Sequence, residues 1–192
     1  MRRVILVLAI STVMAAAVPA FAQEHMLPDK DKTPGDPLLS VPDQKTATCL
    51  TELMGDTVSV HDGISLTMIC TPGYSKCIRN VPQETKKEVY ADYGDPGGNH
   101  QGFCEGSQGC EVDHLISIEI GGSNNKKNLW PQPFSGLKFN AHVKDRLENF
   151  YHAQVCSGEL ALETAQQEIR DDWVAAYKNR IGDTPTAERA RR

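Results

Sequence analysis

Acidic, imidazole and amide side chains that suit phosphodiester chemistry lie close together between residues 111 and 148. Asp113 and His114 are adjacent in the sequence. Asn128 and His142 follow on later segments. Hydrolysis of a phosphodiester requires an activated water, a cation near the charge that develops on the phosphate oxygens, and help for the leaving oxygen. One divalent metal ion and one histidine base supply all three, so this set predicts a metal-assisted hydrolytic site.

The residue types suggest a role for each member of the set. Asp113 offers a hard oxygen ligand, and His114 offers a base whose unperturbed pKa lies near neutrality. Neighbours on an ideal strand point to opposite faces, so both serve one site only if the strand end bends. Asn128 is placed to hydrogen-bond across a hairpin and to fix the ring of His114; an ordinary turn asparagine is the alternative.

The last metal ligand is expected on a helix over residues 140–155. Its buried stripe recurs at helical spacing and consists of Phe139, Val143, Leu147 and Phe150. His142 and Arg146 lie on one shoulder of this stripe, and Asn140 and Lys144 lie on the other. Either shoulder can face the hairpin. We prefer His142 as the ligand because imidazole is the commonest protein metal ligand, and Asn140 is the alternative.

Basic residues surround these candidates and suit contacts to phosphates on either side of a scissile bond. The phosphate-binding candidates are Lys126, Lys127, Lys144 and Arg146. A solvated charged face is the alternative for each of them.

The elements that must position the site indicate an α+β fold. Strands are expected over 66–70, over 112–120 and from 128 to the prolines at 131 and 133, and helices over 82–93, 140–155 and 160–179. Strand, turn, strand and helix around the Asp-His pair make a ββα unit with flanking helices.

The chain begins like an exported protein. Arg2 and Arg3 precede an apolar stretch that ends in a small-residue cleavage pattern near Ala22, which is typical of a signal peptide and too short to favour a membrane anchor. We expect a secreted or periplasmic bacterial protein that is a monomer. The expected segments are a signal peptide (1–22), a flexible Pro-rich arm (23–48), a single domain (49–182) and a flexible tail (183–192).

The even number of cysteines fits disulfides in an oxidising compartment. The candidates are Cys49, Cys70, Cys77, Cys104, Cys110 and Cys156. We favour Cys104 with Cys110, which closes a Gly-rich loop, and Cys70 with Cys156, which ties the front of the domain to its final helices.

The formal charge argues against non-specific coating of nucleic acid. The whole chain carries −5, and loss of two arginines with the leader takes the remainder to about −7. Any contact with nucleic acid must therefore come from a small basic rim around residues 111–148.

The run D-H-L-I-S-I-E-I-G-G-S-N, followed by N-L-W-P-Q-P and H-V-K-D-R-L-E, resembles the HNH endonucleases, in particular exported bacterial members. The resemblance spans residues 69–178 and implies a ββα-metal active site. It implies His114 as general base, Asp113 and His142 as ligands of one divalent metal ion (Mg²⁺, Mn²⁺, Ni²⁺ or Zn²⁺), and Asn128 as the residue that orients the base. The implied substrate is DNA, with RNA as a further possibility, and the implied products carry 5′-phosphate and 3′-hydroxyl ends.

Two other functions fit the sequence. One is a disulfide-stabilised protein of HNH shape that binds metal or nucleic acid without catalysis, which the negative charge favours. The other is the toxic domain of an interbacterial effector, against which the simple signal peptide counts.

Overall fold

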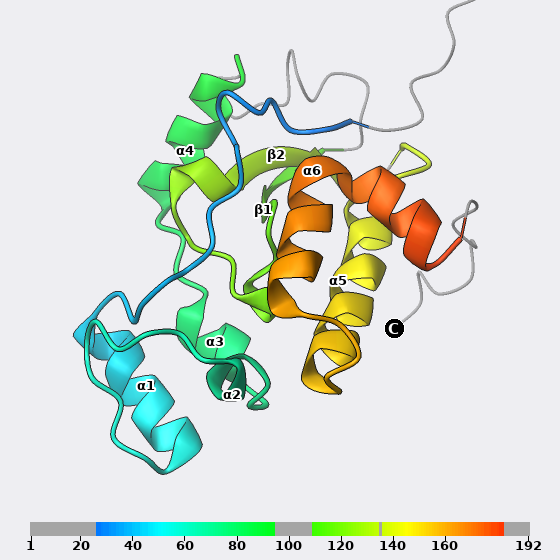
Figure 1. Cartoon of the computed structure of the whole chain (residues 1–192). Helices are drawn as coiled ribbons and strands as arrows, with labels where there is room; N and C mark the ends of the chain where they lie inside the picture. Colours follow the sequence, from blue (N-terminus) through cyan, green and yellow to red (C-terminus); the bar gives the residue numbers. More distant parts are fainter. Residues whose placement is uncertain (1–25, 95–108, 135, 183–192) are drawn as a thin grey trace, which may run out of the picture.

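The structure is a computed structural model and describes residues 26–94, 109–134 and 136–182. Within these ranges it combines helices with a small antiparallel sheet of two strands, so the expected α+β class is confirmed (Figure 1). The elements are α1 (Gln44–Met54), α2 (Leu66–Ile69), α3 (Tyr74–Ile78), α4 (Gln83–Asp92), β1 (Cys110–His114), η2 (Ile118–Ile120), η3 (Lys126–Asn128), β2 (Leu129–Pro133), α5 (Ala141–Cys156) and α6 (Leu162–Arg180). No helix in the described ranges is long and apolar enough to cross a membrane.

The two strands form a hairpin in which His114 pairs with Leu129. The first strand ends at His114, so the expected strand over 112–120 is wrong beyond this residue. Ser117 ends the extended conformation because its hydroxyl accepts from the backbone N–H of Glu119 and begins the short helix η2. Gly121 then closes η2 at a left-handed φ of 78°. The apolar residues in this segment are buried without belonging to a strand.

Helices α5 and α6 lie side by side and provide much of the core beside the hairpin (Figure 1). The expected helix over 140–155 is confirmed, and Asn140 caps its first turn by accepting from the N–H of Val143. The expected final helix is also confirmed, with a kink at Asp172. The Asp172 carboxylate accepts from the N–H groups of Val174 and Ala175, so it caps the second half of α6 as a new helix start.

Residues 26–38 pack against the hairpin and its loops, and residues 39–41 pair with residues 61–64, so the expected flexible arm is wrong for this part of the chain. Thr33 is fully buried, and its hydroxyl donates to the carbonyl of Leu129 at 2.8 Å. The hydroxyl of Ser123 donates to the Asp36 carboxylate at 2.7 Å. The prolines of this segment tolerate its extended conformation while neighbouring polar groups bind the hairpin loops. Residues 23–25 lie outside the described ranges.

Two further expectations concern the segment between α1 and the hairpin. The expected strand over 66–70 is wrong, because Ser65 caps a short helix there through its bond to the N–H of Met68. Alternation of apolar residues over so short a run does not separate strand from helix. The helix expected over 82–93 is confirmed as α4, and Pro82 lies at its N-cap.

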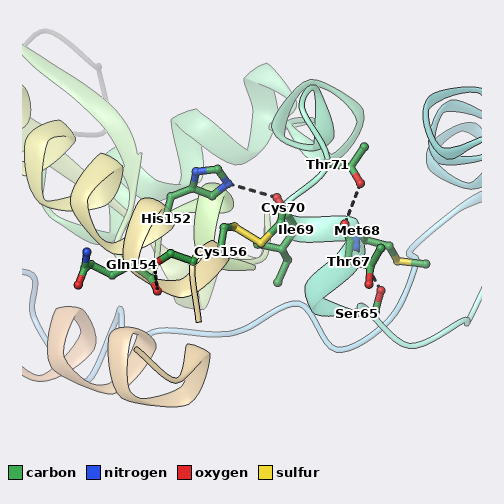
Figure 2. The surroundings of a disulfide bond; sticks show 10 residues. Ser65, Thr67, Met68, Ile69, Cys70, Thr71, His152, Gln154 and Cys156 are labelled. Atoms are coloured by element: carbon green, nitrogen blue, oxygen red, sulfur yellow. Dashed lines mark hydrogen bonds between the residues drawn. A yellow bond between two sulfur atoms is a disulfide. The ribbon is translucent and has the colours of Figure 1, made fainter. Parts of the chain in front are cut away.

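Disulfides join elements that are distant in the sequence. Cys70–Cys156, expected from the sequence, links the end of α2 to the end of α5 (Figure 2). Cys49–Cys77 links α1 to α3. Both fit an oxidising compartment. The proposed partner of Cys110, Cys104, lies outside the described residues, as do the leader (1–22) and the tail (183–192).

Candidate functional site

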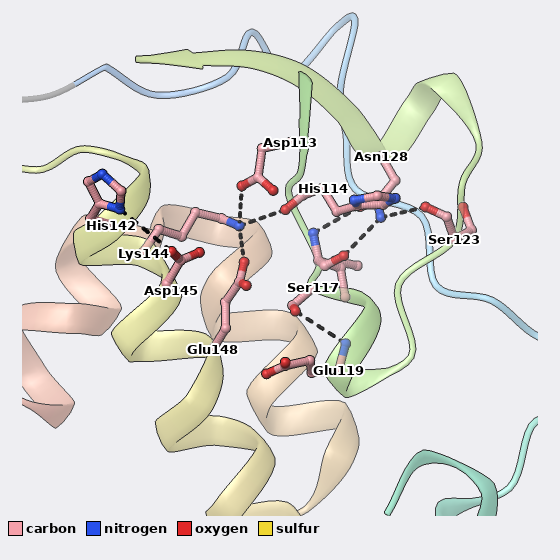
Figure 3. A network of polar contacts seen from close by, with 11 residues as sticks. Asp113, His114, Ser117, Glu119, Ser123, Asn128, His142, Lys144, Asp145 and Glu148 are labelled. Carbon is pink, nitrogen blue, oxygen red and sulfur yellow. Dashed lines mark hydrogen bonds and ion pairs between the residues drawn. The ribbon is translucent and has the colours of Figure 1, made fainter. Parts of the chain in front are cut away.

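Asp113 and His114 lie at the end of β1, where the chain leaves the hairpin beside α5 (Figure 3). Their side chains have different surroundings, as the alternation of a strand requires. The Asp113 carboxylate contacts Lys144 of α5, and the His114 ring contacts Asn124 in the turn before β2. The backbone carbonyl of His114 also binds Lys144, so this lysine contacts both residues of the pair.

Asn124 fixes the ring of His114 and its tautomer. The amide nitrogen of Asn124 donates to the carbonyl of Ile78 at 2.7 Å, which leaves the amide oxygen facing the Nε2 of His114 at 3.1 Å. An amide oxygen only accepts, so Nε2 carries the proton and Nδ1 carries the lone pair. Among the described residues, Nδ1 has no hydrogen-bond partner, and it is buried. His114 therefore presents an oriented proton acceptor.

Burial sets the charge state of this acceptor. It lowers the pKa of His114 to about 4, although the charge of Asp113 opposes the shift. The ring is neutral at any pH well above that value. An unpaired buried acceptor costs about 1–3 kcal/mol, and groups of this kind occur at functional sites.

Asn128 has a different role from the one expected. Its amide nitrogen donates to the carbonyls of Ile116 and Ser123, and its amide oxygen accepts from the backbone N–H of Ile116. These bonds, all at 2.9 Å, hold the loop between β1 and β2. The side chain is fully buried and its hydrogen-bonding capacity is used on backbone groups, so it stabilises the loop, whereas Asn124 orients the ring.

A buried cation joins the hairpin to α5. The Lys144 ammonium donates to Asp113 Oδ2 at 2.8 Å, to the His114 carbonyl at 2.6 Å and to the Glu148 carboxylate (Figure 3). The residue is fully buried. Burial alone lowers the pKa of Lys144, but the charges of Asp113 and Glu148 outweigh it and raise this pKa above its ordinary value. Lys144 was expected to contact phosphate; this is wrong, because its three bonds use the ammonium inside the protein.

Acidic side chains gather around this cation. Burial, followed by the charges of Asp113 and Asp145, raises the pKa of Glu111 to about 7. Burial also raises the pKa of Glu148 to about 7, with Lys144 opposing and Asp113 adding to the shift. For Asp113 itself, burial is outweighed by the positive charge of Lys144, which holds its pKa below the ordinary value. Near neutral pH, Glu111 and Glu148 are therefore only partly ionised beside the Asp113–Lys144 ion pair.

The preferred shoulder of α5 is the one that the structure turns away from Asp113. Lys144 faces the hairpin, and His142 lies about 200° away around the helix. The His142 side chain is 48% exposed, and its ring packs edge-on against Phe134 with centroids 4.4 Å apart. Lys144, on the shoulder shared with Asn140, is the residue that contacts Asp113, and the choice between His142 and Asn140 as metal ligand stays a prediction.

The remaining basic candidates do not form one cluster. Lys126 pairs with Asp92 at 3.1 Å and with Glu88 at 3.4 Å, both on α4. Lys127 is exposed, and Arg146 is partly buried on α5. Ion pairing to α4 reduces the charge that Lys126 offers to a phosphate.

A carboxylate oxygen at the site is the type of donor that a hard cation with several water ligands binds. In the described parts of the chain, no three His, Cys, Asp or Glu side chains are grouped so that they could hold a metal ion. Mg²⁺ is often held by only one or two protein oxygens together with water and substrate phosphates, whereas a structural zinc site needs four nitrogen or sulfur ligands. The Asp113 carboxylate is one such oxygen, whereas the amide oxygen of Asn140 accepts from the N–H of Val143 at the start of α5.

Two contributors were missed from the sequence. Asn124 follows the glycine pair and reads as a turn residue, and only its contact with the ring reveals its role. Glu148 had a usable signal, because Lys144 precedes it by one helical turn, the spacing of an ion pair.

No family model matches the chain, and its comparison with curated proteins and with solved structures finds no match. The inference of function therefore rests on the geometry of the site and on the sequence motifs.

Proposed function

We propose that this chain is an exported, metal-dependent endonuclease that hydrolyses phosphodiester bonds of DNA, and of RNA where the strand fits the same site. The observation that carries the proposal is the His114 ring, whose proton is fixed on Nε2 by Asn124 and whose Nδ1 is an unpaired acceptor. The order β1, β2, α5 around this ring supports a ββα-metal unit of the HNH type.

In the proposed reaction, Nδ1 of His114 accepts the proton of a water as the water oxygen attacks phosphorus. The bond from phosphorus to the 3′-oxygen breaks, and this oxygen leaves as a hydroxyl after taking a proton from solvent. The bond from Nε2 to Asn124 keeps the ring in the orientation that this transfer requires. The imidazolium that forms is balanced by Asp113, whose negative charge favours the protonated ring. Lys144 holds Asp113 through Oδ2, so the carboxylate keeps a fixed position during the reaction.

Asp113 and His142 would hold one divalent metal ion, with Asn140 as the alternative to His142. When bound, the ion supplies positive charge for the phosphate oxygens and for the leaving oxygen. The two disulfides agree with export, for which we propose cleavage of the leader near Ala22.

Nicking of supercoiled plasmid by the chain from Gln23 onward tests the proposal. Mg²⁺, Mn²⁺, Ni²⁺ and Zn²⁺ are compared with EDTA, and we expect nicking with Mg²⁺ or Mn²⁺ that EDTA abolishes. His114→Asn should lower the rate roughly 10²–10⁴-fold, the contribution of a general base. His61→Asn is the matched control, because His61 is exposed and asparagine tolerates its φ of 73°. Equal nicking by His114→Asn and His61→Asn would sink the proposal.

A second candidate is a binding protein of this shape without catalysis. The burial of His114, which is only 2% exposed, favours it because a base needs access to water. Tight binding of a DNA duplex with Mg²⁺ present and no nicking would establish this alternative.

A further inference from the structure

The segment Ile78–Asn80 is connected to the His114 ring through the side chain of Asn124. Asn124 donates to the carbonyl of Ile78 at 2.7 Å and accepts from the N–H of Asn80 at 3.3 Å, and the same amide oxygen contacts the ring. Arg79 lies between these two anchored residues. One amide group therefore fixes the backbone of Arg79 next to the proposed general base.

The Arg79 side chain leaves this anchored backbone at the end of α3, where the chain becomes extended. The residue is exposed. In the described ranges its guanidinium makes no hydrogen bond and no ion pair. Its charge nevertheless lowers the pKa of both His114 and Glu111, so the guanidinium lies within electrostatic reach of the ring and of the adjacent strand. It is a positive charge beside the site that is not bound to a carboxylate.

Two other cations around the site are engaged by carboxylates. Lys144 is buried with its ammonium bound to three oxygens, and Lys126 is paired with Asp92 and Glu88. A guanidinium has a planar set of donors that matches two oxygens of a phosphate, which a lysine ammonium does not. Arg79 therefore has both the position and the donor geometry for an anionic tetrahedral group.

We propose that Arg79 binds the non-bridging oxygens of the scissile phosphate and places this phosphate beside His114. The inference rests on the proposed nuclease function and names a substrate-binding residue for it. Its expected partner is the phosphodiester backbone of a nucleic acid, because a guanidinium–phosphate contact depends on charge and geometry and not on the identity of the base.

The test compares Arg79→Met, Arg79→Lys and a matched control, Lys76→Met. Lys76 is an exposed cation on the same short helix, and its loss changes the net charge equally. Affinity is measured by fluorescence anisotropy of a labelled single-stranded DNA oligonucleotide in Mg²⁺, with His114→Asn present in every protein to prevent turnover. Plasmid nicking is measured in parallel with His114 intact.

We expect Arg79→Met to weaken binding about 10- to 100-fold, the loss of a charged hydrogen-bonded contact. The slope of log affinity against log salt should fall by about 0.7, because one phosphate contact disappears. Arg79→Lys should restore part of the affinity, Lys76→Met should bind nearly as well as the parent, and thermal midpoints should not change. In the nicking assay, kcat/KM should fall for Arg79→Met by a comparable factor.

The two proposals fail in different ways. If the parent chain nicks DNA and Arg79→Met binds and nicks like Lys76→Met, the role of Arg79 is refuted while the nuclease stands. If no protein nicks DNA but Arg79→Met still loses affinity and salt dependence, the phosphate contact stands and the nuclease is refuted. If the oligonucleotide does not bind at all, both are refuted.

Discussion

Replacement of Lys144 by methionine tests whether the buried ammonium holds the hairpin to α5. Lys144 is fully buried, and the side chains of its partners Asp113 and Glu148 are only 18% and 12% exposed. At an effective dielectric constant near 20, each close attraction is worth about 4 kcal/mol. Part of this is offset because the variant no longer buries an ammonium. We expect a net loss of about 3–5 kcal/mol, the value for removing one partner of a buried pair.

The assay is thermal unfolding followed by circular dichroism, at matched protein concentration and pH. A loss of that size lowers the midpoint by roughly 6–20 °C in a domain of this length. Lys127→Met is the control, because Lys127 is exposed and its removal changes the charge equally. A loss for Lys144→Met below about 1 kcal/mol, which is typical of exposed ion pairs, would refute the reasoning.

The dependence on pH separates this mechanism from simple loss of packing. Burial raises the pKa of Glu148 from 4.5 to about 7 even with Lys144 present, and removal of the ammonium raises it further. Between 4.5 and the folded pKa, the folded protein holds a proton that the unfolded chain has released, so stability falls as pH rises through this window. The deficit of Lys144→Met should therefore be larger at high pH than near the lower limit of the window. A deficit independent of pH would indicate packing alone.

Three other outcomes are expected. Asn124→Ala should lower the rate of nicking roughly 10- to 100-fold with little change in stability, as for other residues that orient a reacting side chain. Asn128→Ala should instead cost about 2–4 kcal/mol of unfolding free energy, because buried backbone groups lose their partners. The same nicking rate and stability for both variants would contradict these assignments. On the acid side of its pH profile, the rate of nicking should rise through about pH 4 and then become constant, because burial lowers the pKa of His114 to about 4. A rise centred near the ordinary pKa of histidine would contradict the effect of burial. Reduction of Cys70–Cys156, tested with paired Cys→Ser replacements, should cost about 2–5 kcal/mol in a denaturant titration, and an unchanged midpoint would show that this link does not constrain the fold.

Local sequence signals predicted much of the helical structure. The stripe of α5, its asparagine cap and the proline before α4 depend on residues within one or two helical turns, so they can be read from a short window. The end of β1 could not be read in this way. The apolar run after His114 suits a strand or a buried turn equally. In the structure, the Ser117 cap and the left-handed Gly121 make this run a short helix instead of a strand.

The N-terminal segment shows a different limit. Prolines and polar residues before α1 indicate disorder when taken alone. In the structure, Thr33 and Asp36 find partners on the hairpin loops, about ninety residues away in the sequence. Composition does not contain such contacts, because they arise only when the segment and the loops are brought together.

Residue types and their spacing were enough to predict the chemical groups of the candidate site and most of the helices that carry them. Tertiary structure decided which groups meet. The stripe of α5 has two equivalent shoulders, and only packing against the hairpin turned Lys144 inward and left His142 exposed. Two asparagines flank the same turn, and distance selected Asn124 for the ring and Asn128 for the backbone. Hydrogen bonds and buried charges depend on separations of a few ångströms, which spacing along the chain does not specify.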